Sequence, residues 1–161
     1  MDAAAPTRYP GAMLSQKARY ALRALLHLVE YGGDKPVQAG DIAEAQSVPR
    51  KFLEAILADL TRAGLIASRR GRSGGYLLAR APETISFAEI IRGIDGPLAL
   101  VPCASQNFYA RCGDCHDEAT CAIRRVMMLV RDEAVRILDG TSLADAATAE
   151  LAGLPMPLAL P

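Results

Sequence analysis

The stretch that decides the fold is the end of a helix followed by two short apolar runs around a glycine-rich turn. It reads Leu60-Thr61-Arg62-Ala63-Gly64-Leu65-Ile66-Ala67-Ser68-Arg69-Arg70-Gly71-Arg72-Ser73-Gly74-Gly75-Tyr76-Leu77-Leu78. Two short runs around a turn of this composition predict a β-hairpin, with strands at residues 65–70 and 76–79. Arg69, Arg70 and Arg72 lie at or beside the turn, so we expect a basic hairpin tip.

Three helices are expected before the hairpin. Apolar residues at i, i+3 and i+4 predict the first, from Leu14 to a breaker cluster at residues 32–36. His27, near its apolar face, is interpreted as a packing residue. The second helix spans residues 39–45. The third starts with Pro49 in its first position, ends at a glycine suited to a left-handed cap, and has an apolar face made of Phe52, Leu53, Ile56, Leu57 and Leu60.

A cysteine-rich segment and further helices follow the hairpin. Ser86 and Glu89 form a capping box that opens a helix ending at residues 96–97. A long helix is predicted at residues 122–138, with a short capped helix after residue 141. The long helix carries an apolar stripe of helical period, made of Ile123, Val126, Met127, Val130, Ala134, Ile137 and Leu138. A small domain has little core left to cover this stripe, so we expect a partner helix to pack on it.

Three helices followed by a two-stranded hairpin is the order of a winged helix–turn–helix. The predicted fold class is therefore mainly α with a small β-hairpin wing, plus a long C-terminal dimerisation helix. Residues 1–12 are expected to be a flexible arm and 13–98 the winged helix–turn–helix. Residues 99–121 would be a cysteine-rich sensor segment, 122–148 the dimerisation helix with the short helix, and 149–161 a disordered tail.

Composition narrows the class of protein. The chain has 161 residues, of which 51% are hydrophobic and 22% charged, which suits one folded domain with an extension. No apolar run reaches the roughly 18 residues that a membrane span needs, and the start does not resemble a signal peptide, so we expect a cytoplasmic protein without membrane contact. Residues 13–80 carry a net charge of +5 and residues 101–161 one of −3, which places any polyanion binding in the front half.

The winged helix–turn–helix order predicts contact with double-stranded DNA. The third helix of such a fold enters the major groove, the groove that admits a helix and distinguishes all four base pairs. Arg50 and Lys51 lie at its exposed N-terminal end. The wing could place an arginine in an adjacent minor groove, where glycine permits a close backbone approach. The full set of expected DNA-binding residues is Arg50, Lys51, Glu54, Arg69, Arg70, Arg72, Ser73 and Gly74.

Several motifs together resemble the IscR-type family of bacterial transcription regulators. They are residues 14–25 (Leu-Ser-Gln-Lys-Ala-Arg-Tyr-Ala-Leu-Arg-Ala-Leu), Ile42-Ala43, Phe52-Leu53-Glu54, Leu60-x-x-Ala63-Gly64-Leu65-Ile66 and Arg70-Gly71-x-x-Gly74-Gly75-Tyr76-Leu77-Leu78. The resemblance covers about residues 13–145, and the Gly-Gly-Tyr-x-Leu wing is its most specific part. It implies a homodimer on a palindromic operator, and an iron–sulphur cluster or another signal sensed near the long helix.

Four cysteines form a second group of candidate functional residues. Cys103 is followed after eight residues by Cys112, after two more by Cys115 and after five more by Cys121. Thiolates are the usual ligands of iron–sulphur clusters and of structural zinc, and a cytoplasmic protein keeps its thiols reduced. A [2Fe-2S] or [4Fe-4S] cluster is the first hypothesis. Four-cysteine zinc is the alternative, because Cys112-x-x-Cys115 is a common zinc half-site.

The resemblance also suggests which residues hold the cluster. Family members with a cluster use three cysteines, the last two separated by five residues, which match Cys115 and Cys121. Cys103 is the natural third ligand, and Cys112 is a substitute ligand or an extra thiol. His116 is a candidate non-cysteine ligand, although a polar surface role is preferred. An acidic ligand that some relatives supply from the first helix would fall at Arg19, which cannot coordinate iron.

The sequence predicts a regulator rather than an enzyme. It has no phosphate-cradling glycine loop at a strand-to-helix turn and no pairing of a nucleophile with a base. The predicted function is a DNA-binding regulator, expected to be a repressor, whose affinity depends on a cysteine-held iron–sulphur cluster that responds to iron, redox state or nitric oxide. The alternatives are direct cysteine oxidation without metal on the same fold, or a zinc-stapled DNA-binding module.

Overall fold

The computed structural model describes residues 14–151, with side chains to residue 148. The helices are α1 (Gln16–Tyr31), α2 (Ala39–Gln46), α3 (Arg50–Arg62), α4 (Phe87–Ile94), α5 (Ala122–Asp139) and α6 (Leu143–Leu151). The strands are β1 (Ile66–Arg69) and β2 (Gly75–Leu78), and two short 3-10 turns are η1 (Pro82–Thr84) and η2 (Pro102–Ala104). The expected fold class, mainly helical with a two-stranded wing, is confirmed. The predicted arm at residues 1–12 and most of the predicted tail lie outside the described residues.

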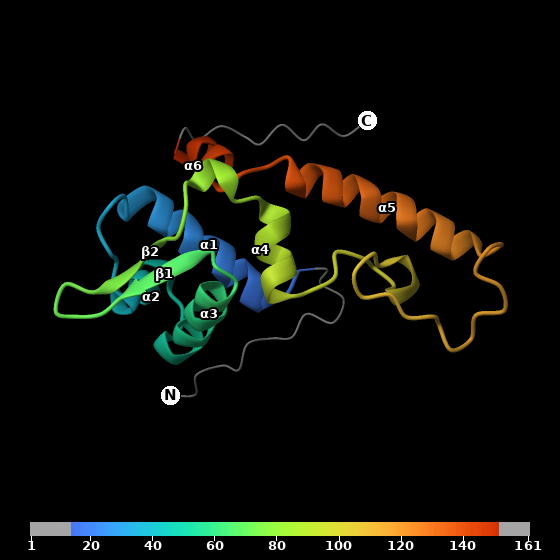
Figure 1. Ribbon diagram of the computed structural model, residues 1–161, viewed down its shortest axis with the longest axis horizontal. Helices are drawn as coiled ribbons and strands as arrows, with labels where there is room; N and C mark the ends of the chain where they lie inside the picture. The colour runs from blue at the N-terminus through green and yellow to red at the C-terminus, as the bar shows by residue number, and fades with distance from the viewer. Residues whose placement is uncertain (1–13, 152–161) are drawn as a thin grey trace.

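Residues 14–98 and α6 form a packed body (Figure 1). Its core contains α1, α3 and α4 side chains such as Leu25, Leu57 and Ile90, which are fully buried. Leu143 of α6 is also fully buried there, and α6 packs against α1 and η1. The helix that the sequence analysis grouped with the dimerisation helix thus lies against the winged helix, and it extends into the segment assigned to the tail.

Capping residues set the helix starts. The side chain of Ser15 accepts a hydrogen bond from Ala18 N at 3.0 Å, so α1 begins one residue after it, slightly later than the pattern predicted. Ser86 caps α4 through Glu89 N, as expected from the capping box. Pro49 precedes α3 as its N-cap rather than occupying its first helical position. Gly64 has the expected left-handed φ of 73° at the exit of α3.

The wing contains more pairing than a simple hairpin. Strands β1 and β2 are antiparallel, with Ile66 opposite Leu78 and Arg69 opposite Gly75. Tyr76 of β2 also pairs with Val37, which lies outside both strands, and the two residues exchange two backbone hydrogen bonds of 2.8 Å. A Cβ at Gly75 would collide with the Val37 carbonyl, and Gly75 has a φ of 150°. This glycine therefore serves the close approach of the chain's own backbone.

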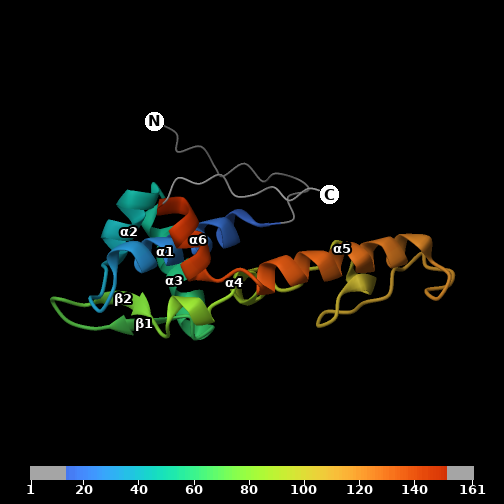
Figure 2. The same cartoon turned by 90° about the horizontal axis from the view of Figure 1, so that it is seen from above.

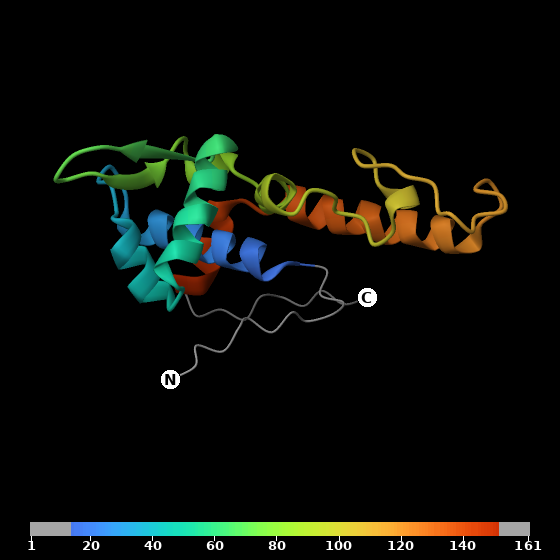
Figure 3. The same cartoon turned by 90° about the horizontal axis from the view of Figure 1, so that it is seen from below.

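Helix α5 extends away from the body, on the side opposite the wing (Figures 2 and 3). The cysteine-rich loop lies along its N-terminal half (Figure 1). Four members of its apolar stripe are exposed within the described structure: Ile123 is 68% exposed, Val126 52%, Val130 39% and Ile137 56%. Leu129, outside the stripe, is 67% exposed. No helix in the described residues is long and apolar enough to cross a membrane.

Candidate nucleic-acid interface and cysteine segment

The turn between α2 and α3 places the N-terminal end of α3 on the surface. Ser47 adopts a left-handed conformation with a φ of 52°, and Val48 after it is buried. Arg23 of α1 binds the end of α2 through Gln46, at 3.0 Å to its side-chain oxygen and 2.8 Å to its carbonyl. The sequence analysis missed both roles, since serine is only an occasional left-handed residue and the Arg23 contact joins distant segments.

The predicted residues of α3 lie on its exposed side. Arg50, Lys51 and Glu54 are all exposed, and Arg50 Nε lies 2.9 Å from Glu54 Oε1. An exposed pair of this kind contributes only about 0.3–0.5 kcal/mol, so Arg50 can exchange it for a phosphate at little cost. Phe52, on the predicted apolar face of α3, is 36% exposed, and its ring meets Tyr20 edge-on at 5.8 Å.

The basic tip of the wing is exposed as expected. Arg69, Arg70, Arg72 and Ser73 are all exposed, and the three arginines have no ion-pair partner within the described part of the chain. A Cβ at Gly74 would collide with the Arg69 carbonyl, so this glycine is required by the turn itself. The wing and α3 are joined through Gly64 and pack together, so one continuous stretch orients both basic groups.

All four cysteines line one cavity of about 350 Å³ at the N-terminal end of α5. Cys103, in η2, is buried, and the other three are half-buried. Cys112 donates a hydrogen bond to Cys103, with 3.6 Å between the two Sγ atoms. This contact, and then desolvation, raise the pKa of Cys112. Cys121 caps α5, and its Sγ accepts a hydrogen bond from Arg124 N at 3.4 Å.

The donor set fits a thiolate-ligated centre in its chemistry. His116, the candidate non-cysteine ligand, is exposed but lines the same cavity, and the N-terminus of α5 favours negative charge on the sulphurs. Arg19 is exposed on α1 and is not among the residues that line it. Among the residues that the structure describes, no three His, Cys, Asp or Glu side chains are already gathered at metal-binding distances. The thiols surround the cavity without forming a closed site.

Arginines of α5 hold the start of the cysteine segment. Arg124 Nε donates to the Cys103 carbonyl at 3.0 Å, and Arg131, one heptad later on the same face, donates to the Ala104 carbonyl. Arg131 is only 9% exposed, and its Nε also contacts Asp132 at 2.8 Å. The sequence analysis missed these contacts because a carbonyl acceptor leaves no mark in the sequence.

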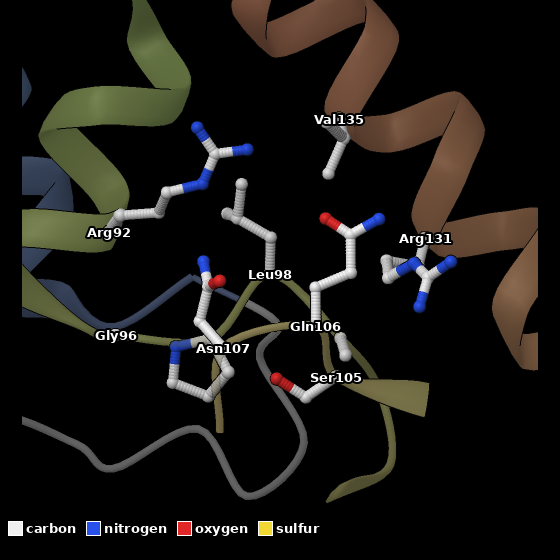
Figure 4. A pocket seen from close by; sticks show the side chains of 10 residues that line it. Arg92, Gly96, Leu98, Ser105, Gln106, Asn107, Arg131 and Val135 are labelled. Carbon is white, nitrogen blue, oxygen red and sulfur yellow. The ribbon is translucent and has the colours of Figure 1, made fainter. Parts of the chain in front are cut away.

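A second small cavity marks the junction between the body and α5. It has a volume of about 20 Å³, and Arg92 of α4 faces Gln106 of the loop and Val135 of α5 across it (Figure 4). Arg92 also binds Asp139 of α5 through two hydrogen bonds of 3.0 and 3.2 Å. The start of the loop after Cys103 thus lies between α4 and α5, where Ser105 is buried, and the residues from Gln106 to Arg111 are exposed.

Comparisons with known proteins agree with this architecture. Residues 14–149 match the model of the Rrf2 family, described as an iron-dependent transcriptional regulator. The chain belongs to the Rrf2 family. An rrf2-like helix–turn–helix regulator of Rhodobacter capsulatus is 46% identical over 136 residues, which cover 83% of this chain and 91% of that protein.

Two solved Rrf2-type structures extend the match to the whole fold. CymR of Bacillus subtilis, the global cysteine regulator, is 32% identical with a TM-score of 0.70, over 84% of this chain and 95% of CymR. IscR of T. potens is 31% identical with a TM-score of 0.69, over 91% of this chain and 94% of that protein. The Rrf2 chain described here is accordingly a helix–turn–helix transcription regulator and not an enzyme.

Proposed function

We propose that the protein is a homodimeric, cytoplasmic repressor whose affinity for DNA is controlled by an iron–sulphur cluster. The observation that carries this proposal is the single cavity lined by all four thiols at the start of α5. Cys103, Cys115 and Cys121 are the proposed ligands. Family descriptions support iron dependence, since the family is described as iron-dependent and IscR is among the relatives.

The DNA contacts follow from the two basic groups. Arg50 and Lys51 would place the N-terminal end of α3 in the major groove, with Glu54 one turn further along. Arg70 and Arg72 would reach the adjacent minor groove from the wing, where the negative potential attracts arginine. Two such units related by a two-fold axis read a palindromic operator.

Helix α5 supplies the proposed dimer contact. Its exposed side chains Ile123, Val126, Val130 and Ile137 recur at three, four and seven residues and form one stripe. An apolar stripe of this length on a helix that leaves the body is stabilised when a second copy covers it. The charged residues Arg125, Asp132 and Arg136 lie in the exposed parts of the same helix and suit the rim of such a contact.

The structure suggests how the cysteine segment reaches the DNA-binding body. A bound cluster would supply a link between thiolates that is lost when iron, redox state or nitric oxide changes. Arg124 and Arg131 hold the Cys103 end of the segment on α5, and Arg92 holds α5 on α4 through Asp139. Loosening the segment shifts α5 relative to α4, and this shift changes the spacing of the two recognition helices. DNA affinity then changes by the difference in stability between the two states.

Anaerobic purification tests the proposal. The full chain is expected to show visible iron–sulphur absorption and to contain iron and acid-labile sulphide, and removal of the cluster should change its affinity for operator DNA. Cys103→Ser, Cys115→Ser and Cys121→Ser should lose the absorption, while Cys112→Ser should keep most of it. A colourless Cys112→Ser with a coloured Cys115→Ser would assign the evenly spaced trio Cys103, Cys112 and Cys121 instead. If the parent protein contains zinc and no iron, the cluster proposal is wrong and the cysteines hold a structural zinc ion instead.

A further inference from the structure

Cys112 is the thiol that the proposed ligand set leaves unused, and it has a specific partner. Its Sγ lies 3.6 Å from that of Cys103, although nothing in the proposed function requires this contact. Cys115 is closer in sequence, yet it meets Cys112 through a backbone hydrogen bond of 3.2 Å in the turn between them. The structure therefore distinguishes Cys103 from the nearer Cys115 as the sulphur that Cys112 meets.

We propose that Cys103 and Cys112 form a reversible intramolecular disulfide when the cysteine segment holds no metal centre. A disulfide has an S–S length of about 2.05 Å, so the two sulphurs must approach by roughly 1.5 Å. Arg124 and Arg131 fix the η2 turn that carries Cys103. The movement therefore falls to Cys112, whose neighbour Gly113 has open space around it and which lies outside any helix or strand.

The burial of the two thiols gives each a role in the reaction. Cys112 is half-buried at the cavity whereas Cys103 is buried, so hydrogen peroxide reaches Cys112 first. The raised pKa of Cys112 slows the step, because its thiol must lose its proton before it reacts. Its thiolate attacks one peroxide oxygen, the O–O bond breaks, and hydroxide leaves a sulfenic acid on Cys112. The Cys103 thiolate then attacks that sulphur, the S–O bond breaks, and a second hydroxide leaves. The two protons released by the thiols convert both hydroxides to water, and the two electrons lost by the sulphurs reduce the peroxide.

The disulfide has a consequence that rests on the proposed function. Cys103 is one of the proposed cluster ligands, and a sulphur in a disulfide cannot ligate iron as a thiolate. Oxidised protein is therefore expected to bind no cluster until the Cys103–Cys112 disulfide is reduced. Cys112, dispensable for holding the cluster, becomes the residue that decides whether the empty segment can be reloaded.

Peptide mapping of the full chain tests the bond directly. Reduced protein treated with a chelator receives one equivalent of hydrogen peroxide, and free thiols are counted before and after. The count should fall from four to two and return to four with dithiothreitol. Without reduction, cleavage after Arg111 and Arg124 should yield peptide 93–111 linked to peptide 112–124. Cleavage before Asp95 and Asp114 should instead leave both sulphurs in one peptide, 95–113, which lacks two hydrogens.

Matched variants make the assignment specific. Cys115→Ser should still form the bond and keep one free thiol, whereas Cys112→Ser should keep all three of its thiols under the same treatment. The native chain is mapped in parallel, so the assignment does not depend on the folding of either variant. A bond from Cys112 to Cys115, a bond to Cys121, or sulfinic acid with no bond would each overturn the proposal.

Cluster loading separates this inference from the proposed function. If the disulfide forms but reduced protein never takes up iron and sulphide, the cluster proposal is wrong and the disulfide proposal is supported. If reduced protein takes up a cluster but the mapped bond is missing, the pair fails and the cluster proposal stands. When both hold, oxidised Cys112→Ser should load as well as its reduced form, while the oxidised parent should load only after reduction.

Discussion

The body of the protein differs from α5 with its cysteine loop, here called the α5 arm, in which side chains are buried and which are exposed. In the body, apolar residues of α1, α3 and α4 cover one another, and the polar contacts include helix caps and ion pairs between helices. In the arm, apolar residues are exposed, while Arg131 is buried and bound to a carbonyl. Exposed apolar side chains and thiols around a cavity are typical of a segment that binds a partner and a ligand. For the arm, we propose a second copy of the chain and a metal centre.

The largest expected effect is a loss of folding stability from a substitution in the body, compared with the same substitution in the α5 arm. Leu57→Ala removes a fully buried side chain from the core, so the free energy of unfolding should fall by about 2–5 kcal/mol. Leu129→Ala removes the same atoms from a side chain that is 67% exposed and does not belong to the predicted stripe. Chemical denaturation should place this second variant within about 0.5 kcal/mol of the parent. Equal losses in both variants would mean that α5 is covered as thoroughly as the core.

The next effect concerns assembly. Val130→Glu places a charge in the middle of the α5 stripe, and burying it against a second helix without a partner should weaken dimerisation by on the order of 3 kcal/mol. Sedimentation equilibrium measures this loss, with Glu44→Gln, at an exposed residue of α2 in the body, as control. A Val130→Glu protein as dimeric as the parent would show that the stripe is not the dimer contact.

The same contrast explains what the sequence could predict. Regular apolar spacing located α1, α3 and α5 to within about two residues, because periodicity reflects the face that a helix buries. Spacing does not say what covers that face, so it could not predict that Phe52 is 36% exposed and meets Tyr20 edge-on. The four thiols were found from their clustering. Their arrangement depends on Arg124 and Arg131 binding carbonyls, a long-range contact that has no local pattern.

A smaller effect tests the wing on DNA. Arg70→Ala together with Arg72→Ala should weaken operator binding and reduce the slope of log affinity against log salt by about one unit for each phosphate that the wing no longer neutralises. Binding measured at several salt concentrations gives this slope. The double variant Arg19→Ala and Lys35→Ala removes the same charge from exposed positions outside the proposed DNA and dimer contacts and serves as its control. A slope that falls equally in both would reflect net charge rather than contact with DNA.

The smallest effect is a pH dependence confined to the body. Lys17 of α1 contacts the Asp59 carboxylate of α3, and this hydrogen bond, with help from Arg62, holds the pKa of Asp59 below its usual value. A carboxyl whose pKa is lower in the folded state stabilises the fold above its unfolded pKa of about 3.9, and this contribution disappears as the pH falls through the folded pKa. Asp59→Asn should therefore cost up to about 1 kcal/mol at pH 7 and less at pH 3, because at low pH the parent loses the same interaction. Asp114→Asn, in the cysteine loop, has no such ion pair within the described residues and should change unfolding equally little at both pH values. An Asp59→Asn penalty that is the same at both pH values would locate its cause in packing between α1 and α3 rather than in charge.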